Sequence, residues 1–336
     1  MIPEERLKEL FEDFSKQNIL IIGDVMIDSY LWGKVDRISP EAPVPIVSLR
    51  KRESRMGGAA NVALNIQSMG ANPILCSVIG QDDKSHVFFD LMQKQGLDTR
   101  GILTSPDRIT TTKFRIIGNN AQMLRVDEET EKSLSEEETL GLVDRIAEYV
   151  EQASVGAIVF EDYDKGVISP LLIDKVVQMA QSRKIPVVVD PKKKNFMNYR
   201  GVTLFKPNLK ELREGLKLDE ELHSMEQIGA AVQLLQQKLE VQTALATLSE
   251  KGVYFSHQNA DGSFVTGNIS AHVRDIADVS GAGDTVISII ALCMASRTSV
   301  ELMAKLANLA GGLVCEYVGV VPVNREKLFL EAVKSL

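Results

Sequence analysis

Short apolar runs alternate with longer amphipathic segments along most of the chain. The apolar runs predict buried strands at 18–25, 73–79, 156–160, 186–190, 202–205, 243–247 and 252–257. The amphipathic segments predict helices at 59–69, 84–95, 135–152, 169–183, 208–215, 225–239, 283–295 and 299–317. Alternation at this spacing indicates an α/β fold with a mostly parallel central sheet covered by helices on both faces.

Two stretches, 33–55 and 101–127, break this alternation. The first contains Pro40, Pro43 and Pro45, and the second is rich in threonine and β-branched residues. Both predict short antiparallel strands without helices, which together would form a small sheet that stands off the main domain as a lid. Because exposed edge strands are a liability that proteins usually cover, we expect a homodimer that forms through these lid segments.

Composition limits the class of protein. With 336 residues, 44% of them hydrophobic and 25% charged, the chain is expected to form one large globular domain or two unequal parts. A net charge of −8 argues against a general nucleic-acid binder. The acidic N-terminus does not resemble a signal peptide, and no apolar run approaches the roughly 18 residues of a membrane span. Three distant cysteines in apolar segments suggest reduced thiols, so we expect a cytoplasmic protein.

The segment Asp278-Val-Ser-Gly-Ala-Gly-Asp284-Thr285 carries the strongest chemical signal. Small residues between two carboxylates open an apolar helix, so the backbone amides of Gly281, Ala282 and Gly283 are expected to point outward at the positive end of the helix dipole. Such amides form an anion hole. Asp284 at its edge could accept a proton from a hydroxyl, an arrangement that suits phosphoryl transfer from a nucleotide to an alcohol.

Two further segments could hold a sugar. Gly57 and Gly58 precede a helix whose first turn contains Asn61, and the amide of this residue can both donate to and accept from a hydroxyl. Asp24 and Asp28 flank the end of the first predicted strand, where open α/β sheets bind ligands. A plain helix start and turn-stabilising carboxylates remain the alternatives.

Asn208 and Glu211 follow a predicted strand and begin a helix. Their spacing is that of a reciprocal N-terminal cap. The alternative is that Glu211 organises water around a Mg²⁺ ion, which prefers oxygen ligands and retains several waters.

Several cations could bind phosphate. Lys165 and Lys192 follow strands, whereas Lys113, Arg115 and Arg125 lie in the predicted lid, where arginine suits a second, non-transferred phosphate because its planar fork pairs bidentately. Each could equally be an ordinary surface charge. The four histidines lack metal-ligand spacing, and no Walker-type loop occurs.

Three motifs in register resemble the ribokinase/PfkB family of sugar kinases: Gly57-Gly-Ala-Ala-Asn61-Val-Ala, Asn208-Leu-Lys-Glu211 and Asp278-Val-Ser-Gly-Ala-Gly-Asp284-Thr. The resemblance covers essentially the whole chain. It implies a three-layer α/β/α kinase domain over 1–336 with a β-sheet lid, and ATP and Mg²⁺ as cofactors.

The resemblance narrows to the bacterial D-glycero-β-D-manno-heptose 7-phosphate kinases through Gly23-Asp-Val-Met-Ile-Asp28, Arg37-Ile-Ser-Pro-Glu-Ala-Pro-Val-Pro45 and Asp162-Tyr-Asp-Lys-Gly166. It implies phosphorylation of the anomeric hydroxyl, which gives heptose 1,7-bisphosphate for ADP-heptose and lipopolysaccharide core synthesis. Many members carry a nucleotidyltransferase domain with a His-x-Gly-His motif. This motif is missing here, so adenylylation is expected from another protein.

The resemblance also assigns roles. Asp284 would be the general base above the anion hole, and Asp24, Asp28, Gly58 and Asn61 would hold the sugar. Asn208 and Glu211 would act near Mg²⁺ and the phosphates. The nucleotide side would be lined by Thr247, Ser249 and Gly252, with Asn308 near adenine. Lys165, Lys192 and Arg125 would be phosphate contacts.

Three positions depart from the family pattern: Leu248 replaces an arginine, Glu161 replaces a serine, and 318–322 lacks a Gly-Thr pair. These positions lie on the expected nucleotide side and at the sheet edge, so they bear on the contacts to the phosphoryl donor more than on the type of reaction. A kinase for another sugar or sugar phosphate, or a catalytically silent sugar-binding protein, are the alternative functions.

Overall fold

The computed structural model describes residues 2–119, 121–272 and 274–336, and its centre is a nine-stranded sheet. The strand order is β13-β12-β11-β10-β9-β8-β1-β4-β5. Pairing is parallel from β5 across to β11 and antiparallel from β11 to β13. The strands are β1 (Asn18–Gly23), β4 (Asn72–Gly80), β5 (Ile102–Ser105), β8 (Val155–Glu161), β9 (Val187–Asp190), β10 (Leu204–Phe205), β11 (Thr243–Thr247), β12 (Val253–Gln258) and β13 (Phe264–Ile269).

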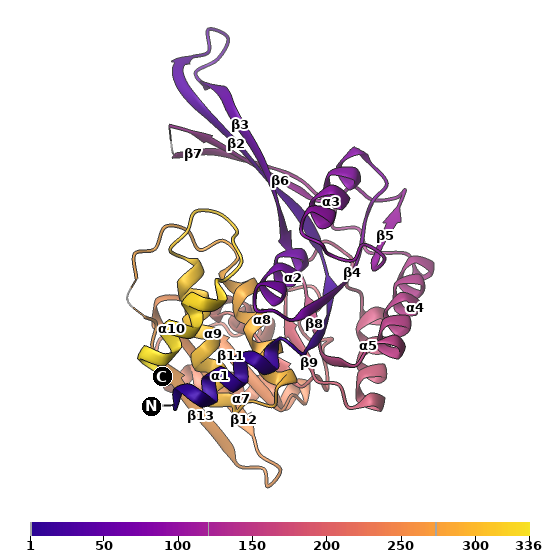
Figure 1. Ribbon diagram of the computed structural model, residues 1–336, viewed down its shortest axis with the longest axis vertical. Coiled ribbons are helices and arrows are strands. Elements are labelled where there is room, and N and C mark those ends of the chain that lie inside the picture. Colours follow the sequence, from indigo (N-terminus) through magenta and orange to yellow (C-terminus); the bar gives the residue numbers. More distant parts are fainter. Residues whose placement is uncertain (1, 120, 273) are drawn as a thin grey trace.

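Helices cover both faces of this sheet, as predicted (Figure 1). Alternate residues of β1 enter different cores: Ile19 and Ile21 pack with one set of helices, and Leu20 and Ile22 with the other. The first set comprises α1 (Glu4–Phe14), α2 (Ala59–Ser68), α3 (Asp83–Lys94), α8 (Ala282–Ala295), α9 (Val300–Val314) and α10 (Arg325–Ser335). The second comprises α4 (Glu136–Gln152), α5 (Pro170–Arg183), α6 (Leu209–Leu216) and α7 (Met225–Leu239). The three-layer α/β/α prediction is confirmed.

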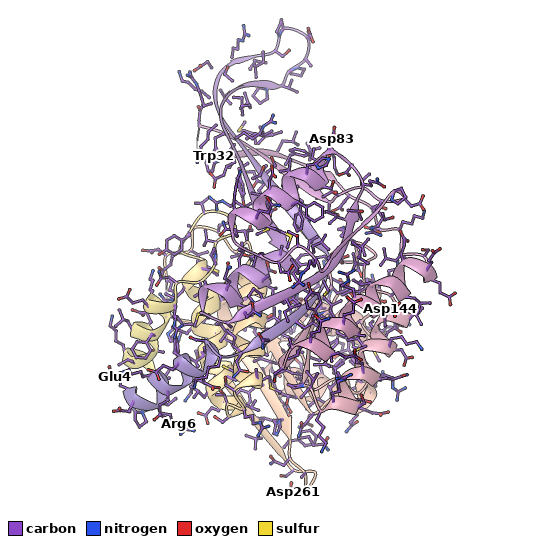
Figure 2. The ribbon with its side chains drawn as sticks, turned by 45° about the vertical axis from the view of Figure 1, so that its right-hand side comes forward. Glu4, Arg6, Trp32, Asp83, Asp144 and Asp261 are labelled. Atoms are coloured by element: carbon purple, nitrogen blue, oxygen red, sulfur yellow. The ribbon has the colours of Figure 1, made fainter. Side chains whose placement is uncertain are left out.

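A separate four-stranded sheet forms the lid and projects from the main body (Figure 1). Its order is β3-β2-β6-β7, with the bounds β2 (Val25–Ile38), β3 (Pro45–Gly58), β6 (Thr112–Gly118) and β7 (Ala121–Glu128). Figure 2 labels Trp32 in this sheet and Asp261 in the β12–β13 turn, on opposite sides of the molecule.

The predicted lid bounds of 33–55 and 101–127 were wrong in three respects. The strands of the hairpin are longer, because β2 begins at Val25 and β3 continues to Gly58. β2 pairs with β6 in parallel rather than antiparallel fashion. The segment Ile102–Ser105 is β5, which extends the main sheet beside β4, where Ile102 and Ser105 are buried.

The two faces of the lid differ in chemistry. Directly paired residues on neighbouring strands share a face, and Tyr30 pairs with Arg115, which pairs with Arg125. This face is aromatic and cationic. Leu124 and Val126 lie on the other face of β7, where their side chains are 55% and 45% exposed.

Most predicted helices and strands are confirmed within a few residues. The sequence prediction missed α1, β13 and α10, so 299–317 does not close the chain; α9 ends at Val314 and α10 follows it. α10 buries only Leu328 and Ala332 among its residues, so its apolar pattern was weak. All three cysteines are unbonded, as predicted. Among the described residues, no helix combines the length and apolar character needed to span a bilayer.

Candidate functional site

The candidate site lies where the parallel strands of the main sheet end. Gly23 of β1 is in register with Glu161 of β8, and Glu161 with Asp190 of β9. Asp24 and Lys206 directly follow β1 and β10. Because the carboxyl ends of parallel strands form one edge of a sheet, residues far apart in sequence converge here, at the position where open α/β sheets bind ligands.

The N-terminus of α8, where the anion hole was predicted, lies at this edge. Gly281 is the N-cap, in the left-handed conformation with φ of 79° that glycine tolerates, and no side chain of the described structure caps the helix. The amide of Ala282 donates to the carbonyl of Val279 over 3.3 Å. The side of Gly283 on which a Cβ would lie faces the Asp190 carboxylate and the Lys206 ammonium.

Asp284 sits in the first turn of α8 and is buried. Its Oδ2 accepts a hydrogen bond from Asn61 Nδ2, and its Oδ1 accepts one from the Tyr163 hydroxyl, each over 2.7 Å. Burial raises the pKa of this carboxyl to about 6, although both hydrogen bonds act to lower it. A pKa near 6 leaves the group ionised and basic at neutral pH, which is the range a general base needs.

Gly57, Gly58 and Asn61 connect the lid to this centre. The two glycines end β3, and Gly58 is the N-cap of α2, so Asn61 lies in the first turn of that helix, fully buried. The sequence prediction therefore placed Asn61 near the sugar side but did not identify its bond to Asp284. Asn65, one turn later, accepts from the Thr285 hydroxyl over 3.0 Å and fixes α2 against α8.

Asp24 holds the loop that follows β8. Its Oδ2 accepts from the backbone amides of Tyr163 and Lys165 at 2.9 and 3.1 Å, and its Oδ1 accepts from the amide of Val167 at 3.0 Å. Burial, with the nearby Asp162 carboxylate, raises the pKa of Asp24 to about 6 against the lowering effect of these three bonds. Its carboxylate thus fixes the position of Tyr163; its predicted role as a sugar ligand stays a prediction.

A buried charge cluster beneath α8 was not predicted from the sequence. Lys206 Nζ lies 2.8 Å from Asp190 Oδ2, and both side chains are buried. Burial acts to lower the pKa of Lys206, but Asp190 and Glu211 raise it above its usual value. Glu161 lies beside this pair, where burial and the charges of Asp190 and Asp284 raise its pKa.

The predicted nucleotide-side residues are brought together around α6. Asn208 and Glu211 form the reciprocal cap, with Asn208 Oδ1 accepting from the Glu211 amide at 2.8 Å and Glu211 Oε2 from the Asn208 amide at 2.9 Å. Lys192 Nζ donates to Glu211 Oε1 over 2.5 Å. Thr247 forms a parallel bridge with Asn208. Glu211 therefore caps α6, which was one of the two roles considered for it from the sequence.

The remaining nucleotide-side residues lie beyond β11. Ser249 begins a short 3₁₀ helix (Ser249–Lys251), and Gly252 follows it as the C-cap, directly before β12. Asn308 of α9 donates to the carbonyl of Ser270 over 2.9 Å, which ties α9 to the segment after β13. Within the three described ranges, no group of three or more His, Cys, Asp or Glu is placed to hold a metal ion.

The lid cations differ in their surroundings. Arg115 forms an ion pair with the buried carboxylate of Asp28. Lys113 and Lys165 both approach Glu129, at 4.0 and 2.8 Å. Arg125, directly opposite Arg115 in the sheet, is half exposed and pairs with Asp127 of its own strand at 3.0 Å.

The whole chain resembles known kinases in sequence. The model of the family described as pfkB family carbohydrate kinase matches residues 16–327. The bifunctional protein HldE of Methylobacillus flagellatus is 39% identical over 310 residues, which cover 92% of this chain. That of Helicobacter pylori strain J99 is 36% identical over 314 residues, or 94% of this chain. The chain spans 62% and 66% of the lengths of these relatives.

Solved structures share the fold at low sequence identity. Phosphofructokinase-2 from Escherichia coli, in complex with substrates and products, has a TM-score of 0.76 at 16% identity and covers 94% of this chain and 99% of its own. Arabidopsis thaliana ribokinase, complexed with ribose and ATP, has a TM-score of 0.71 at 17% identity, with 96% and 100% covered.

Proposed function

The chain belongs to the pfkB family of carbohydrate kinases, and from this premise we propose that it transfers the γ-phosphoryl group of ATP to the anomeric hydroxyl of D-glycero-β-D-manno-heptose 7-phosphate. The observation that carries the reaction type is the buried Asp284 carboxylate at the open N-terminus of α8. The choice of sugar is supported by the HldE relatives, which match more than nine tenths of the chain, and by the Arg37–Pro45 run.

Asp284 would act as the general base. The sugar hydroxyl would replace one of its two hydrogen-bond donors, Asn61 or Tyr163, and give its proton to the carboxylate as the oxygen attacks phosphorus. The amides of Gly281, Ala282 and Gly283 would stabilise the charge on the transferring group. Asp24, Asp28, Gly57, Gly58 and Asn61 would hold and orient the sugar.

The phosphates of ATP would lie over α6 and the end of β11. Asn208, Lys192 and Thr247 are close together there, and Glu211 would face the metal through water while Lys192 balances its charge. Bound Mg²⁺ would neutralise charge between the phosphate oxygens. Ser249, Gly252 and Asn308 would complete the nucleotide side.

The 7-phosphate of the sugar, which is not transferred, would bind under the lid, at Lys113 and Lys165. Glu129 lies beside both ammonium groups, so a phosphate dianion would displace this carboxylate. Arg125, the other predicted contact, would reach the phosphate only if its pair with Asp127 opened.

A homodimer through the lid completes the proposal. The apolar face that carries Leu124 and Val126 is exposed in the single chain, and a second lid packed on it would bury both side chains.

A phosphoryl-transfer assay tests the function. The purified protein is incubated with ATP, Mg²⁺ and one acceptor at a time: heptose 7-phosphate, fructose 6-phosphate or ribose. ADP release and the ³¹P spectrum of the product are followed. We expect a new anomeric phosphate with heptose 7-phosphate alone. Preference for another acceptor would refute the assigned substrate, and binding without transfer to any of the three would favour a sugar-binding protein.

A further inference from the structure

The segment 318–320, after α9, lies between the catalytic turn and the lid. Asp278 joins the turn before α8 to this segment. Its Oδ1 accepts hydrogen bonds from the Ser280 amide at 3.0 Å and the Ser280 hydroxyl at 2.8 Å. Its Oδ2 accepts one from the Gly319 amide at 2.9 Å. Ser280 immediately precedes Gly281, the N-cap of α8. The position of 318–320 is therefore coupled to the first amides of the anion hole.

Two residues of the lid form hydrogen bonds with the same segment, 318–320. Arg55 Nη1 donates to the carbonyls of Val318 and Val320 at 3.4 and 3.1 Å. The Tyr30 hydroxyl accepts from the Val320 amide at 3.3 Å. Arg55 comes from β3 and Tyr30 from β2, so both belong to the lid sheet at its junction with the main body.

The backbone at Gly319 packs closely against Tyr30 and Arg55. Gly319 has a φ of 77°, which favours glycine, and a Cβ at this position would lie 2.7 Å from Tyr30 Oη and 3.0 Å from Arg55 Nη1. A side chain at 319 would push the two lid residues away. The three residues 318–320 can therefore approach the lid only because the middle one lacks a Cβ.

The contact extends to the sugar side through one aromatic ring. The guanidinium groups of Arg55 and Arg115 lie 5.1 and 5.4 Å from the centroid of the Tyr30 ring. Arg115 forms the ion pair with Asp28, a proposed sugar ligand. A continuous set of contacts thus runs from Asp28 through Arg115, Tyr30 and Arg55 to the segment that Asp278 binds.

We propose that Arg55 and Tyr30 are positioning residues that transmit the position of the lid to the anion-hole turn, so that sugar binding under the lid orders the turn for the nucleotide. The coupling to sugar rests on the proposed function. The ordering of the turn by Arg55 does not, because it concerns the ligand-free protein. Arg55 touches neither reacting group, and its effect reaches the amides of Gly281–Gly283 only through 318–320 and Asp278.

Amide hydrogen exchange on the ligand-free protein tests the mechanical part. Arg55→Gln removes the charged fork that holds the carbonyls of Val318 and Val320, so exchange at the amides of Ser280, Gly319 and Val320 should accelerate about tenfold. Tyr30→Phe keeps the ring and loses the hydroxyl acceptor, so acceleration should be confined to Val320. Arg55→Lys, which keeps the charge without the planar fork, should restore part of the protection.

Arg6→Gln is the control. Arg6 is an exposed arginine of α1, which lies away from the lid (Figure 2), so its loss should leave exchange and turnover unchanged. Equal exchange in the Arg55→Gln and Arg6→Gln proteins would overturn the proposal, whether or not the heptose is the substrate.

Binding and turnover test the functional part. The affinity for adenylyl imidodiphosphate with Mg²⁺ is measured by calorimetry with and without heptose 7-phosphate. The unchanged protein should bind the nucleotide about fivefold or more tightly when the sugar is present, and Arg55→Gln should abolish this difference. The kcat of Arg55→Gln should fall about tenfold, with KM for the sugar within about threefold of its original value, because positioning rather than binding is lost. If Arg55→Gln keeps the difference in nucleotide affinity with and without sugar, the coupling is refuted. If the protein without substitutions phosphorylates no sugar, the proposed function is refuted instead. In that case the exchange experiment still decides the role of Arg55.

Discussion

Asp284 combines two properties that are hard to reconcile in water. Burial raises its pKa to about 6, yet hydrogen bonds from Asn61 and Tyr163 favour the ionised form. The carboxylate therefore stays available as a base at neutral pH while it is basic enough to accept a proton. Tyr163 itself is held in place by the Asp24 carboxylate through its backbone amide, so two buried aspartates determine the surroundings of the proposed base.

The pH dependence of kcat/KM should follow this group. As pH falls through about 6, Asp284 becomes protonated and can no longer accept the sugar proton, so kcat/KM should fall on the acid side. Tyr163→Phe removes a bond that lowers the pKa of Asp284, so the acid limb should move to higher pH. Tyr254→Phe, in β12, is the control and should not move it. An acid limb at the same pH in both variants would mean that Tyr163 does not tune the base.

Asp284→Asn should reduce kcat by several powers of ten, because the general base is lost together with the orientation it provides. The structure should be kept, since asparagine has nearly the same shape. Steady-state kinetics with ATP and the preferred acceptor measure the loss. Asp261→Asn, in the exposed β12–β13 turn at the end of the molecule opposite the lid (Figure 2), should retain full activity. Near-full activity of Asp284→Asn would show that another group accepts the proton.

The loop between β8 and α5 owes its conformation to Asp24 rather than to regular secondary structure. Three backbone amides, from the alternate residues Tyr163, Lys165 and Val167, donate to its carboxylate. In Asp24→Asn the NH₂ group replaces one acceptor, so at least one buried amide loses its partner, at a cost of about 2 kcal/mol in the free energy of unfolding. Urea denaturation at pH 7 measures this change.

Asp36→Asn is the control for that experiment. Asp36 is half exposed in β2 and pairs with the exposed Lys34 at 2.7 Å, a surface ion pair whose loss should change stability by less than about 0.5 kcal/mol. Equal midpoints for the two variants would show that the amides find other partners when Asp24 is replaced.

The elements that sequence predicted best are those whose signals are local. Asn208 and Glu211 are three residues apart, and their spacing alone indicated where α6 begins. The contacts of Asp284 with Asn61 and Tyr163 join positions 223 and 121 residues apart, so no periodicity could indicate them. The ion pair of Lys206 with Asp190 was missed for the same reason, because the local sequence around each residue indicated only the end of a strand.

The error in the lid also has a physical cause. Strands of two different sheets can have the same apolar pattern, so 101–127 was predicted as one unit although Ile102–Ser105 (β5) pairs with β4 and Thr112–Gly118 (β6) with β2. Only the pairing partner separates them. The same ambiguity hid the start of β2, which follows β1 after a single residue, Asp24.

At the scale of the whole molecule, the two faces of the lid differ in what they present. One face of the lid carries Tyr30 and Arg115 and continues into the site, whereas Leu124 and Val126 lie on the other face and are exposed. If two chains associate through this apolar face, each lid is fixed at its outer side. Closure over the sugar would then depend on association, and loss of the dimer should reduce activity as well as mass.

The unchanged protein should therefore scatter light as a particle of twice the 37.0 kDa chain mass, and Leu124→Glu should give the single-chain mass, because a carboxylate cannot be buried unpaired in an apolar interface. Leu330→Glu is the matched control: Leu330 is 50% exposed, close to the 55% of Leu124, but lies on α10, away from the lid. It should leave the mass unchanged. A single-chain mass for the unchanged protein at assay concentrations would refute the dimer. A dimer that survives Leu124→Glu and dissociates in Leu330→Glu would place the interface at α10 and leave the apolar face of the lid without a partner.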